Sequence, residues 1–246
     1  VSMGMADGYA RATGRPAFVN LHVTGGLTNG LSLLYNAYRG GTPLVLTAGQ
    51  SDTRTMLEEP ILWSDQVRLC RQYTKWSAEP VHPEDVPRAL RRAFRQAATP
   101  PTGPVFLSLP WDVLDAECEY HPQPPSPVYG KIRPDARAVE QAAALLAGAE
   151  KPLMLVGDRV AQCSGVAEAV RVAEQLGAPV RAAGFSEVNF PTGCGHFFGP
   201  ANVDFPAGRK TFEQHDVLLA VGCNLLSQFL YNPDILPPDL PVIHLD

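Results

Sequence analysis

Continuous apolar runs alternate with amphipathic segments along the first half of the chain. The runs read as buried strands, because they are short and contain no regular polar alternation: 17–23 (AFVNLHV), 43–47 (PLVLT) and 103–109 (GPVFLSL). Apolar positions at helical spacing predict three helices, one before the first strand and one after each of the first two strands: 2–13, 28–38 and 82–98. Strands of this kind between helices are typical of a parallel sheet covered on both faces.

The segment 121–134 is rich in proline, so it cannot continue a helix or a central strand and predicts an extended linker. A second α/β pattern of the same kind follows it. Helices are expected from Asp135, as a cap, to Leu146 and over 165–176, and strands over four runs: 152–157, 179–182, 215–221 and 241–245. The prediction is an α/β protein of two three-layer units, each with a mainly parallel sheet flanked by helices. The units span residues 1–120 and 135–246.

Composition narrows the function classes. The chain has 246 residues, 20 Lys+Arg against 25 Asp+Glu, and no basic run, which argues against a nucleic-acid partner. No apolar stretch approaches the length of a membrane span. The five cysteines are widely spaced and never form C-x-x-C, so neither a disulfide framework nor a zinc site is expected, as in a reducing cytoplasm. Because the chain begins at Val1 in apparent mid-helix, we expect a piece of a longer protein.

The segment 20–30 (NLHVTGGLTNG) carries the main candidate chemistry. A buried strand delivers His22 to its carboxyl end, and a glycine turn at Gly25 and Gly26 is expected to lead into the next helix. Ligands of parallel α/β sheets bind beyond the carboxyl ends of the strands. Histidine is suited to moving protons near neutral pH. A buried structural histidine, hydrogen-bonded to backbone, is the alternative for His22.

Two further segments have two interpretations each. Ile61, Leu62 and Trp63 form an apolar group in a polar loop, which either anchors the loop in the core or lines a substrate pocket. Residues 157–159 (GDR) follow a strand but lack the glycines of a phosphate-binding loop, so a helix-entry turn is expected.

The chain resembles the thiamine-diphosphate-dependent decarboxylase superfamily. The likeness rests on 4–14 (GMADGYARATG), 16–29 and 38–50 (YRGGTPLVLTAGQ), and it extends with less specific motifs over the second unit. Within that superfamily it resembles benzoylformate decarboxylases most, through His22 in its N-L-H context, the TAGQ strand end followed by Thr53 and Arg54, and 75–80 (KWSAEP). Acetolactate synthases are similar, but they usually carry Ser-Gly-Pro-Gly where this chain has 22–26.

The resemblance implies a homodimer or homotetramer with its active site between subunits, which decarboxylates a benzoylformate-like 2-oxo acid, a small molecule, to an aldehyde. His22 would transfer a proton to or from the substrate. Gly25, Gly26 and Asn29 would face the aminopyrimidine of thiamine diphosphate, and Leu62 and Trp63 would line the substrate pocket. The activating glutamate is expected upstream of Val1. Mg²⁺ and the diphosphate are expected in a third domain outside this chain, so no metal ligand is assigned here.

One departure from the family pattern leaves the reaction open. In 222–233 (GCNLLSQFLYNP), Phe229 stands where benzoylformate decarboxylases place a second pocket histidine. Phenylalanine cannot move a proton. The alternatives are an acetolactate-synthase-like carboligase with FAD in its central domain, a non-catalytic nucleotide-binding α/β module, and a chain whose role is to bury a dimer face.

Overall fold

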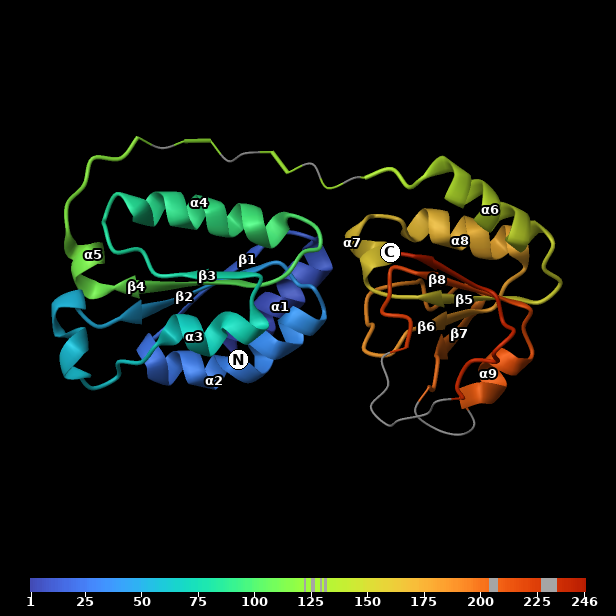
Figure 1. Cartoon of the computed structure of the whole chain (residues 1–246), viewed down its shortest axis with the longest axis horizontal. Helices are drawn as coiled ribbons and strands as arrows, with labels where there is room; N and C mark the ends of the chain where they lie inside the picture. The colour runs from blue at the N-terminus through green and yellow to red at the C-terminus, as the bar shows by residue number, and fades with distance from the viewer. Residues whose placement is uncertain (122, 125–126, 129, 131, 204–207, 227–233) are drawn as a thin grey trace. The chain divides into compact units, whose positions relative to one another are not determined.

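The computed structural model describes residues 1–121, 123–124, 127–128, 130, 132–203, 208–226 and 234–246. The chain divides into two compact units, Val1–Gly130 and Lys131–Asp246 (Figure 1). Each unit contains a parallel sheet with helices on its faces, so the predicted fold class is confirmed.

The first unit contains four strands in the order β1-β2-β4-β3, and every neighbouring pair is parallel. Its strands are β1 (Ala17–Leu21), β2 (Leu44–Gln50), β3 (Trp76–Ala78) and β4 (Val105–Pro110). Its α-helices are α1 (Ser2–Thr13), α2 (Val23–Arg39), α3 (Gln66–Cys70), α4 (Asp85–Ala98) and α5 (Trp111–Asp115), and it has two 3-10 helices, Thr53–Glu58 and Arg71–Tyr73.

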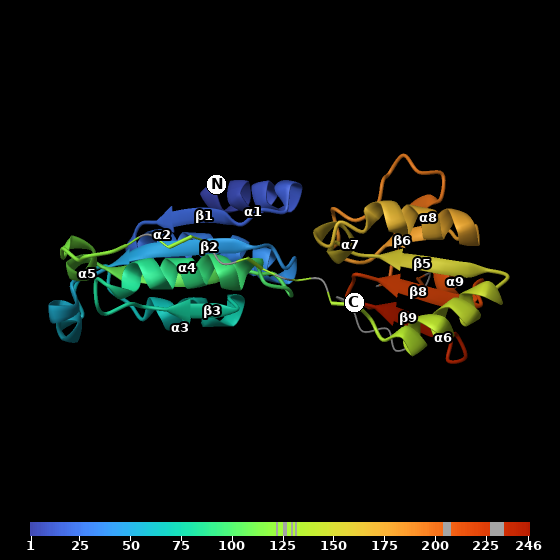
Figure 2. The same cartoon turned by 90° about the horizontal axis from the view of Figure 1, so that it is seen from above.

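Alternation along β2 divides the core of this unit into two layers. Leu44, Leu46 and Ala48 pack with α1, α2 and α3, whereas Val45 packs with Ala93 and other residues of α4. Figures 1 and 2 show α4 on one face of the sheet and α1, α2 and α3 on the other. Because successive side chains of a strand point to opposite faces, the first part of β2, Leu44 to Leu46, is apolar on both faces.

The second unit contains a five-stranded parallel sheet in the order β7-β6-β5-β8-β9. Its strands are β5 (Pro152–Val156), β6 (Val180–Ala182), β7 (Phe197–Pro200), β8 (Val217–Val221) and β9 (Val242–Leu245). Its helices are α6 (Ala136–Ala147), α7 (Arg159–Gln162), α8 (Val166–Leu176) and α9 (Arg209–Glu213). Met154 and Val156 pack with α8, whereas Leu153 and Leu155 pack with Phe212 of α9.

Several predicted elements have different bounds in the structure. The first strand ends at Leu21 and α2 begins at Val23, five residues before the predicted helix. Strands β3 and β7 were not predicted from the sequence. Asp135 does cap α6, because its carboxylate accepts a hydrogen bond from the Ala138 N–H at 3.0 Å.

Candidate active site

His22 lies at the carboxyl end of β1 and is the N-cap residue of α2. Its backbone is extended (φ −81°, ψ 110°) and its side chain is exposed. The alternative of a buried histidine hydrogen-bonded to backbone is therefore wrong. Within the described residues, the imidazole has no hydrogen-bond partner, so both ring nitrogens are free to meet a ligand.

The glycine turn expected after His22 is absent, because Gly25 and Gly26 lie in the first turn of α2. The chain reverses direction at Val23 instead, whose φ of 34° is unusual for a β-branched residue. Such backbone strain persists only where the surroundings fix it. The side chain of Val23 meets Gly49 at the end of β2, where a Cβ would lie 3.7 Å from Val23 Cγ1.

Asn29 lies one turn along α2 and is exposed. Its Nδ2 donates to the carbonyl oxygen of Gly25 at 2.9 Å, and the hydroxyl of Thr28 donates to the same oxygen at 3.1 Å. The structure therefore places His22, Gly25, Gly26 and Asn29 together on the first two turns of one helix. Their assigned roles stay predictions.

The loop 51–65 follows β2 and carries the predicted pocket residues. Ile61 is 89% exposed and Leu62 is 49% exposed, whereas Trp63 is half-buried. A loop-anchoring core role is therefore wrong for Ile61 and Leu62. The φ values of Glu59 (48°) and Leu62 (71°) lie in the left-handed region, which non-glycine residues rarely adopt.

Two aspartates hold the start of this loop. Asp52 pairs with Arg54, and this hydrogen bond lowers the pKa of Asp52 to about 2. Asp112, in α5 after β4, accepts from both the N–H and the hydroxyl of Thr53. Burial alone would raise the pKa of Asp112, but the hydrogen bonds from Thr53 outweigh it and lower the pKa.

Two buried glutamines hold the end of the loop. Gln50 is 4% exposed and its Nε2 donates to the carbonyl of Ser64 at 2.8 Å. Gln66 is 1% exposed; its Nε2 donates to the Gly49 carbonyl at 2.8 Å and its Oε1 accepts from the Ser108 hydroxyl at 3.0 Å. Sequence reasoning missed both. For Gln50 the sequence does carry a signal, a lone glutamine at the end of an apolar strand, because a buried amide needs hydrogen-bond partners.

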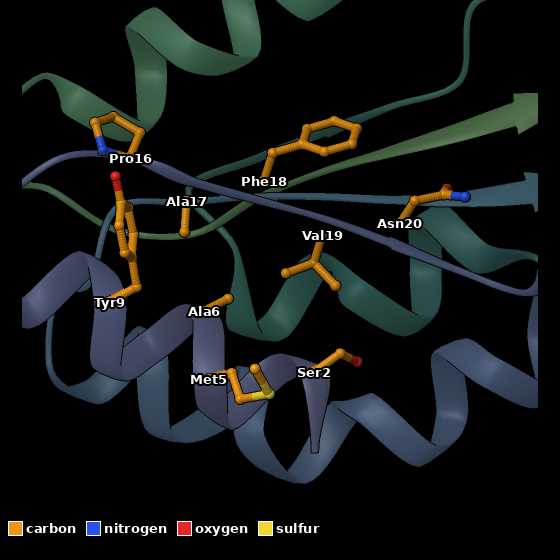
Figure 3. A pocket seen from close by; sticks show the side chains of 9 residues that line it. All are labelled: Ser2, Met5, Ala6, Tyr9, Pro16, Ala17, Phe18, Val19 and Asn20. Atoms are coloured by element: carbon orange, nitrogen blue, oxygen red, sulfur yellow. The ribbon is translucent and has the colours of Figure 1, made fainter.

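A pocket of about 600 Å³ lies on another side of this unit (Figure 3). It is lined by residues of α1, of β1 and of the connection between them: Ser2, Met5, Ala6, Tyr9, Pro16, Ala17, Phe18, Val19 and Asn20. His22 is not among them. Figure 3 shows Phe18 directed away from α1, where its ring stacks on Phe94 of α4 at a centroid distance of 6.2 Å.

In the second unit, residues 157–159 form a helix-entry turn, as predicted, and α7 begins at Arg159. Gly157 packs against the turn after β8, where a Cβ would lie 2.3 Å from the Gly222 carbonyl oxygen. The Arg159 guanidinium pairs with the carboxylate of Asp246. Phe229, the remaining predicted pocket residue, lies outside the described residues.

Neither a metal site nor a membrane span emerges from the described part of the chain. It contains no group of three or more His, Cys, Asp or Glu side chains arranged to hold a metal ion. None of its helices combines the length and the apolar character needed to span a bilayer.

Comparison with known proteins gives matches over both units. The family description "Thiamine pyrophosphate enzyme, N-terminal TPP binding domain" matches residues 1–69, and "Thiamine pyrophosphate enzyme, central domain" matches residues 139–246. A benzoylformate decarboxylase of Pseudomonas aeruginosa is 34% identical over 99% of this chain and 47% of its own length. An acetolactate synthase large subunit of Corynebacterium glutamicum is 29% identical over 98% of this chain and 39% of its own length.

Solved structures agree with these matches. A thiamine diphosphate-dependent 4-hydroxybenzoylformate decarboxylase of Rhodococcus jostii RHA1 aligns with a TM-score of 0.88 at 34% identity, over 98% of this chain and 47% of that protein. The chain thus spans about half the length of the relatives that it matches. With both family regions matched in order and the fold shared, the chain belongs to the thiamine pyrophosphate enzyme family.

Proposed function

We propose that this chain forms part of a thiamine-diphosphate-dependent enzyme that decarboxylates a benzoylformate-like 2-oxo acid to an aldehyde. The names of two relatives, a benzoylformate decarboxylase and a 4-hydroxybenzoylformate decarboxylase, support this substrate class. The observation that carries the proposal is the exposed imidazole of His22 at the carboxyl end of β1, where parallel sheets bind their ligands.

The residues around His22 fit the aminopyrimidine end of the cofactor. A Cβ built on Gly25 would have no atom within 4 Å apart from the adjoining residues and the backbone of its own helix, so a planar ring has room to approach the helix there. Gly26 is more confined, since its Cβ would lie 3.4 Å from that of His22. Asn29, with Gly25 and Gly26, would hold the ring. Mg²⁺ and the diphosphate are assigned by the resemblance to a third domain, and that assignment stays a prediction.

When bound, thiamine diphosphate supplies the electron sink that carbon–carbon cleavage beside a ketone requires. In this proposal, the chain's own residues orient the substrate and move protons. The His22 imidazole donates a proton to the substrate oxygen or carbon, or removes one. Leu62 and Trp63 shape the space for the acid's side chain. Trp63 is larger than the leucine usual in the family, so that space differs in shape from the family's.

The test is His22→Ala in the complete protein. Turnover of benzoylformate should fall by at least about tenfold, because a positioned acid or base contributes about 10²–10⁴-fold. Thiamine diphosphate binding, followed by fluorescence titration, should be retained. His82→Ala, which removes an exposed histidine in another loop, is the matched control. Unchanged turnover of His22→Ala removes His22 from the mechanism.

The acetolactate synthase match favours a second candidate, carboligation of 2-oxo acids. Product identification separates the two, since a decarboxylase releases CO₂ and an aldehyde, whereas a carboligase joins two 2-oxo acids with loss of one CO₂ and releases a 2-hydroxy-3-oxo acid. Purified protein that is yellow from FAD would also favour the carboligase.

We further propose that the complete protein is a cytoplasmic homodimer or homotetramer whose active site lies between subunits. The resemblance supports this assembly. Light scattering coupled to size-exclusion chromatography tests it, and a monomer that is fully active contradicts it.

A further inference from the structure

Ser64 is the residue at which the loop 51–65 returns to the carboxyl end of β2. Its carbonyl oxygen accepts two hydrogen bonds, from Gln50 Nε2 and from the N–H of Gln66, each at 2.8 Å. Its hydroxyl lies 2.8 Å from the hydroxyl of Thr24 in the first turn of α2. One residue thus connects the loop to both β2 and α2.

The β2 side of this connection is rigid. The Gln50 side chain is buried, and its Oε1 accepts from the N–H of Ser51 at 2.9 Å while its Nε2 binds Ser64. An amide held at both ends has one favoured orientation, and losing either bond inside the protein costs free energy. The carbonyl of Ser64 is therefore fixed relative to the end of β2.

The α2 side of the connection leads directly to the candidate catalytic residue. Thr24 follows His22 by two residues, and Ser64 directly follows Trp63. Because consecutive Cα atoms are about 3.8 Å apart, the bond between the two hydroxyls fixes the loop close to the residue that carries the imidazole. The tip of the loop is held by local backbone hydrogen bonds, from the Trp63 N–H to the Pro60 carbonyl at 3.0 Å and from the Glu59 N–H to the Met56 carbonyl at 3.1 Å, and Ile61 there is exposed.

We propose that Thr24 and Ser64 form a positioning pair that sets where Trp63 and Leu62 stand relative to His22, and thereby selects the 2-oxo acid by the size of its side chain. This inference rests on the proposed function. Thr24 and Ser64 act through the loop and need not touch the substrate.

The experiment uses the complete protein with Thr24→Val, Ser64→Ala and the double variant. Thr24→Ser restores the hydroxyl and serves as the rescue. Thr99→Val is the matched control, because it removes a half-buried threonine hydroxyl that donates to the Arg95 carbonyl at the end of α4, far along the chain from the loop 51–65. The kcat and KM values are measured for benzoylformate, 4-methyl-2-oxopentanoate and pyruvate. Hydrogen–deuterium exchange is measured for peptides covering 59–65.

Thr24→Val and Ser64→Ala should each raise KM for the preferred acid about three- to tenfold, the range expected for one hydrogen bond, with kcat changed less than about twofold. The ratio of kcat/KM between large and small acids should fall, and exchange in 59–65 should rise. Thr24→Ser should behave as the parent. The double variant should be no worse than either single variant, because both remove the same bond.

Unchanged exchange, or an equal loss of kcat/KM for all three acids, overturns the positioning role. If the parent protein is active and the variants keep its selectivity among the three acids, the role of the Thr24–Ser64 pair is wrong, while the proposed function stands. A parent protein that turns over none of the acids overturns the proposed function and the selectivity role with it.

Discussion

Asp112 accepts two hydrogen bonds from Thr53, one from its N–H at 2.9 Å and one from its hydroxyl at 2.5 Å. This pair joins the start of the loop after β2 to the helix after β4. The neighbouring strands β2 and β4 are thus coupled beyond their ends, at the edge of the sheet where His22 lies.

Asp112→Ala should loosen the start of this loop and lower the free energy of unfolding by on the order of 1 kcal/mol, because two acceptors are lost. Asp115→Ala, in the same helix and exposed, is the control. Urea unfolding followed by tryptophan fluorescence measures the difference. Equal stabilities of the two variants contradict the prediction.

The hydrogen bonds from Thr53 to the carboxylate of Asp112 should weaken at low pH. The pKa of Asp112 is lowered in the fold, so its contribution to stability is present above the unfolded pKa, about 3.9, and is lost as the pH falls through the folded value. Acrylamide quenching of tryptophan fluorescence should stay constant from pH 7 to about pH 4 and rise below that. Asp112→Ala should reduce the size of this acid-induced change.

Trp63→Leu should shift preference toward bulkier 2-oxo acids, because it enlarges the proposed substrate space. The profile of kcat/KM across acids of increasing side-chain size measures the effect in the complete protein. Leu57→Ala, at a 95% exposed position of the same loop, is the control. A profile identical to that of the parent places Trp63 in the core of the loop instead.

Gly157→Ala should destabilise the second unit by about 2 kcal/mol or more. The added Cβ would lie 2.3 Å from the Gly222 carbonyl oxygen and 2.5 Å from Cys223 Cβ, and both belong to a packed turn. Gly193→Ala is the matched control, because no atom lies within 4 Å of its Cβ and its φ is not positive. Thermal unfolding distinguishes them; similar midpoints would show that the turn after β8 can move aside.

The five cysteines are free and should separate into classes by their reaction with a thiol reagent. Cys118 and Cys163 are exposed and should react fast, whereas Cys70 and Cys223 should react only on unfolding. Burial raises the pKa of Cys70 to about 12 and that of Cys223 to about 11. Stability from these neutral thiols is therefore complete below the ordinary thiol pKa and declines as the pH rises above about 9. Four or more fast thiols in native protein would contradict this assignment.

The continuous apolar runs predict every strand of the two described sheets except β3 and β7. Strands such as 43–47 must be apolar on both faces, and that requirement leaves a direct signal in the sequence. The short strands carry a weaker signal: β3 is only three residues long and half-buried, and β7 follows a glycine-rich segment. Their positions depend on tertiary pairing with β4 and β6 rather than on local preference.

The candidate site was predicted only in part, for a related reason. The sequence predicts the position of His22 at a strand end, but it predicts a turn at Gly25 and Gly26, whereas both lie in the helix, where glycine is intrinsically unfavourable. Packing of α2 on the sheet outweighs that preference. The pairing of Gln50 with Ser64 could not be predicted, since a hydrogen bond between residues fourteen positions apart leaves no periodic pattern.

The strand order has a practical outcome for anyone handling this chain by itself. Strand β1 hydrogen-bonds to β2 on one side, and within the described residues no strand pairs with its other side. An unpaired edge strand can form backbone hydrogen bonds with a strand of a second molecule. We therefore expect concentrated samples of the isolated chain to aggregate through this strand, and Phe18→Lys, at an exposed position of β1, should reduce that aggregation.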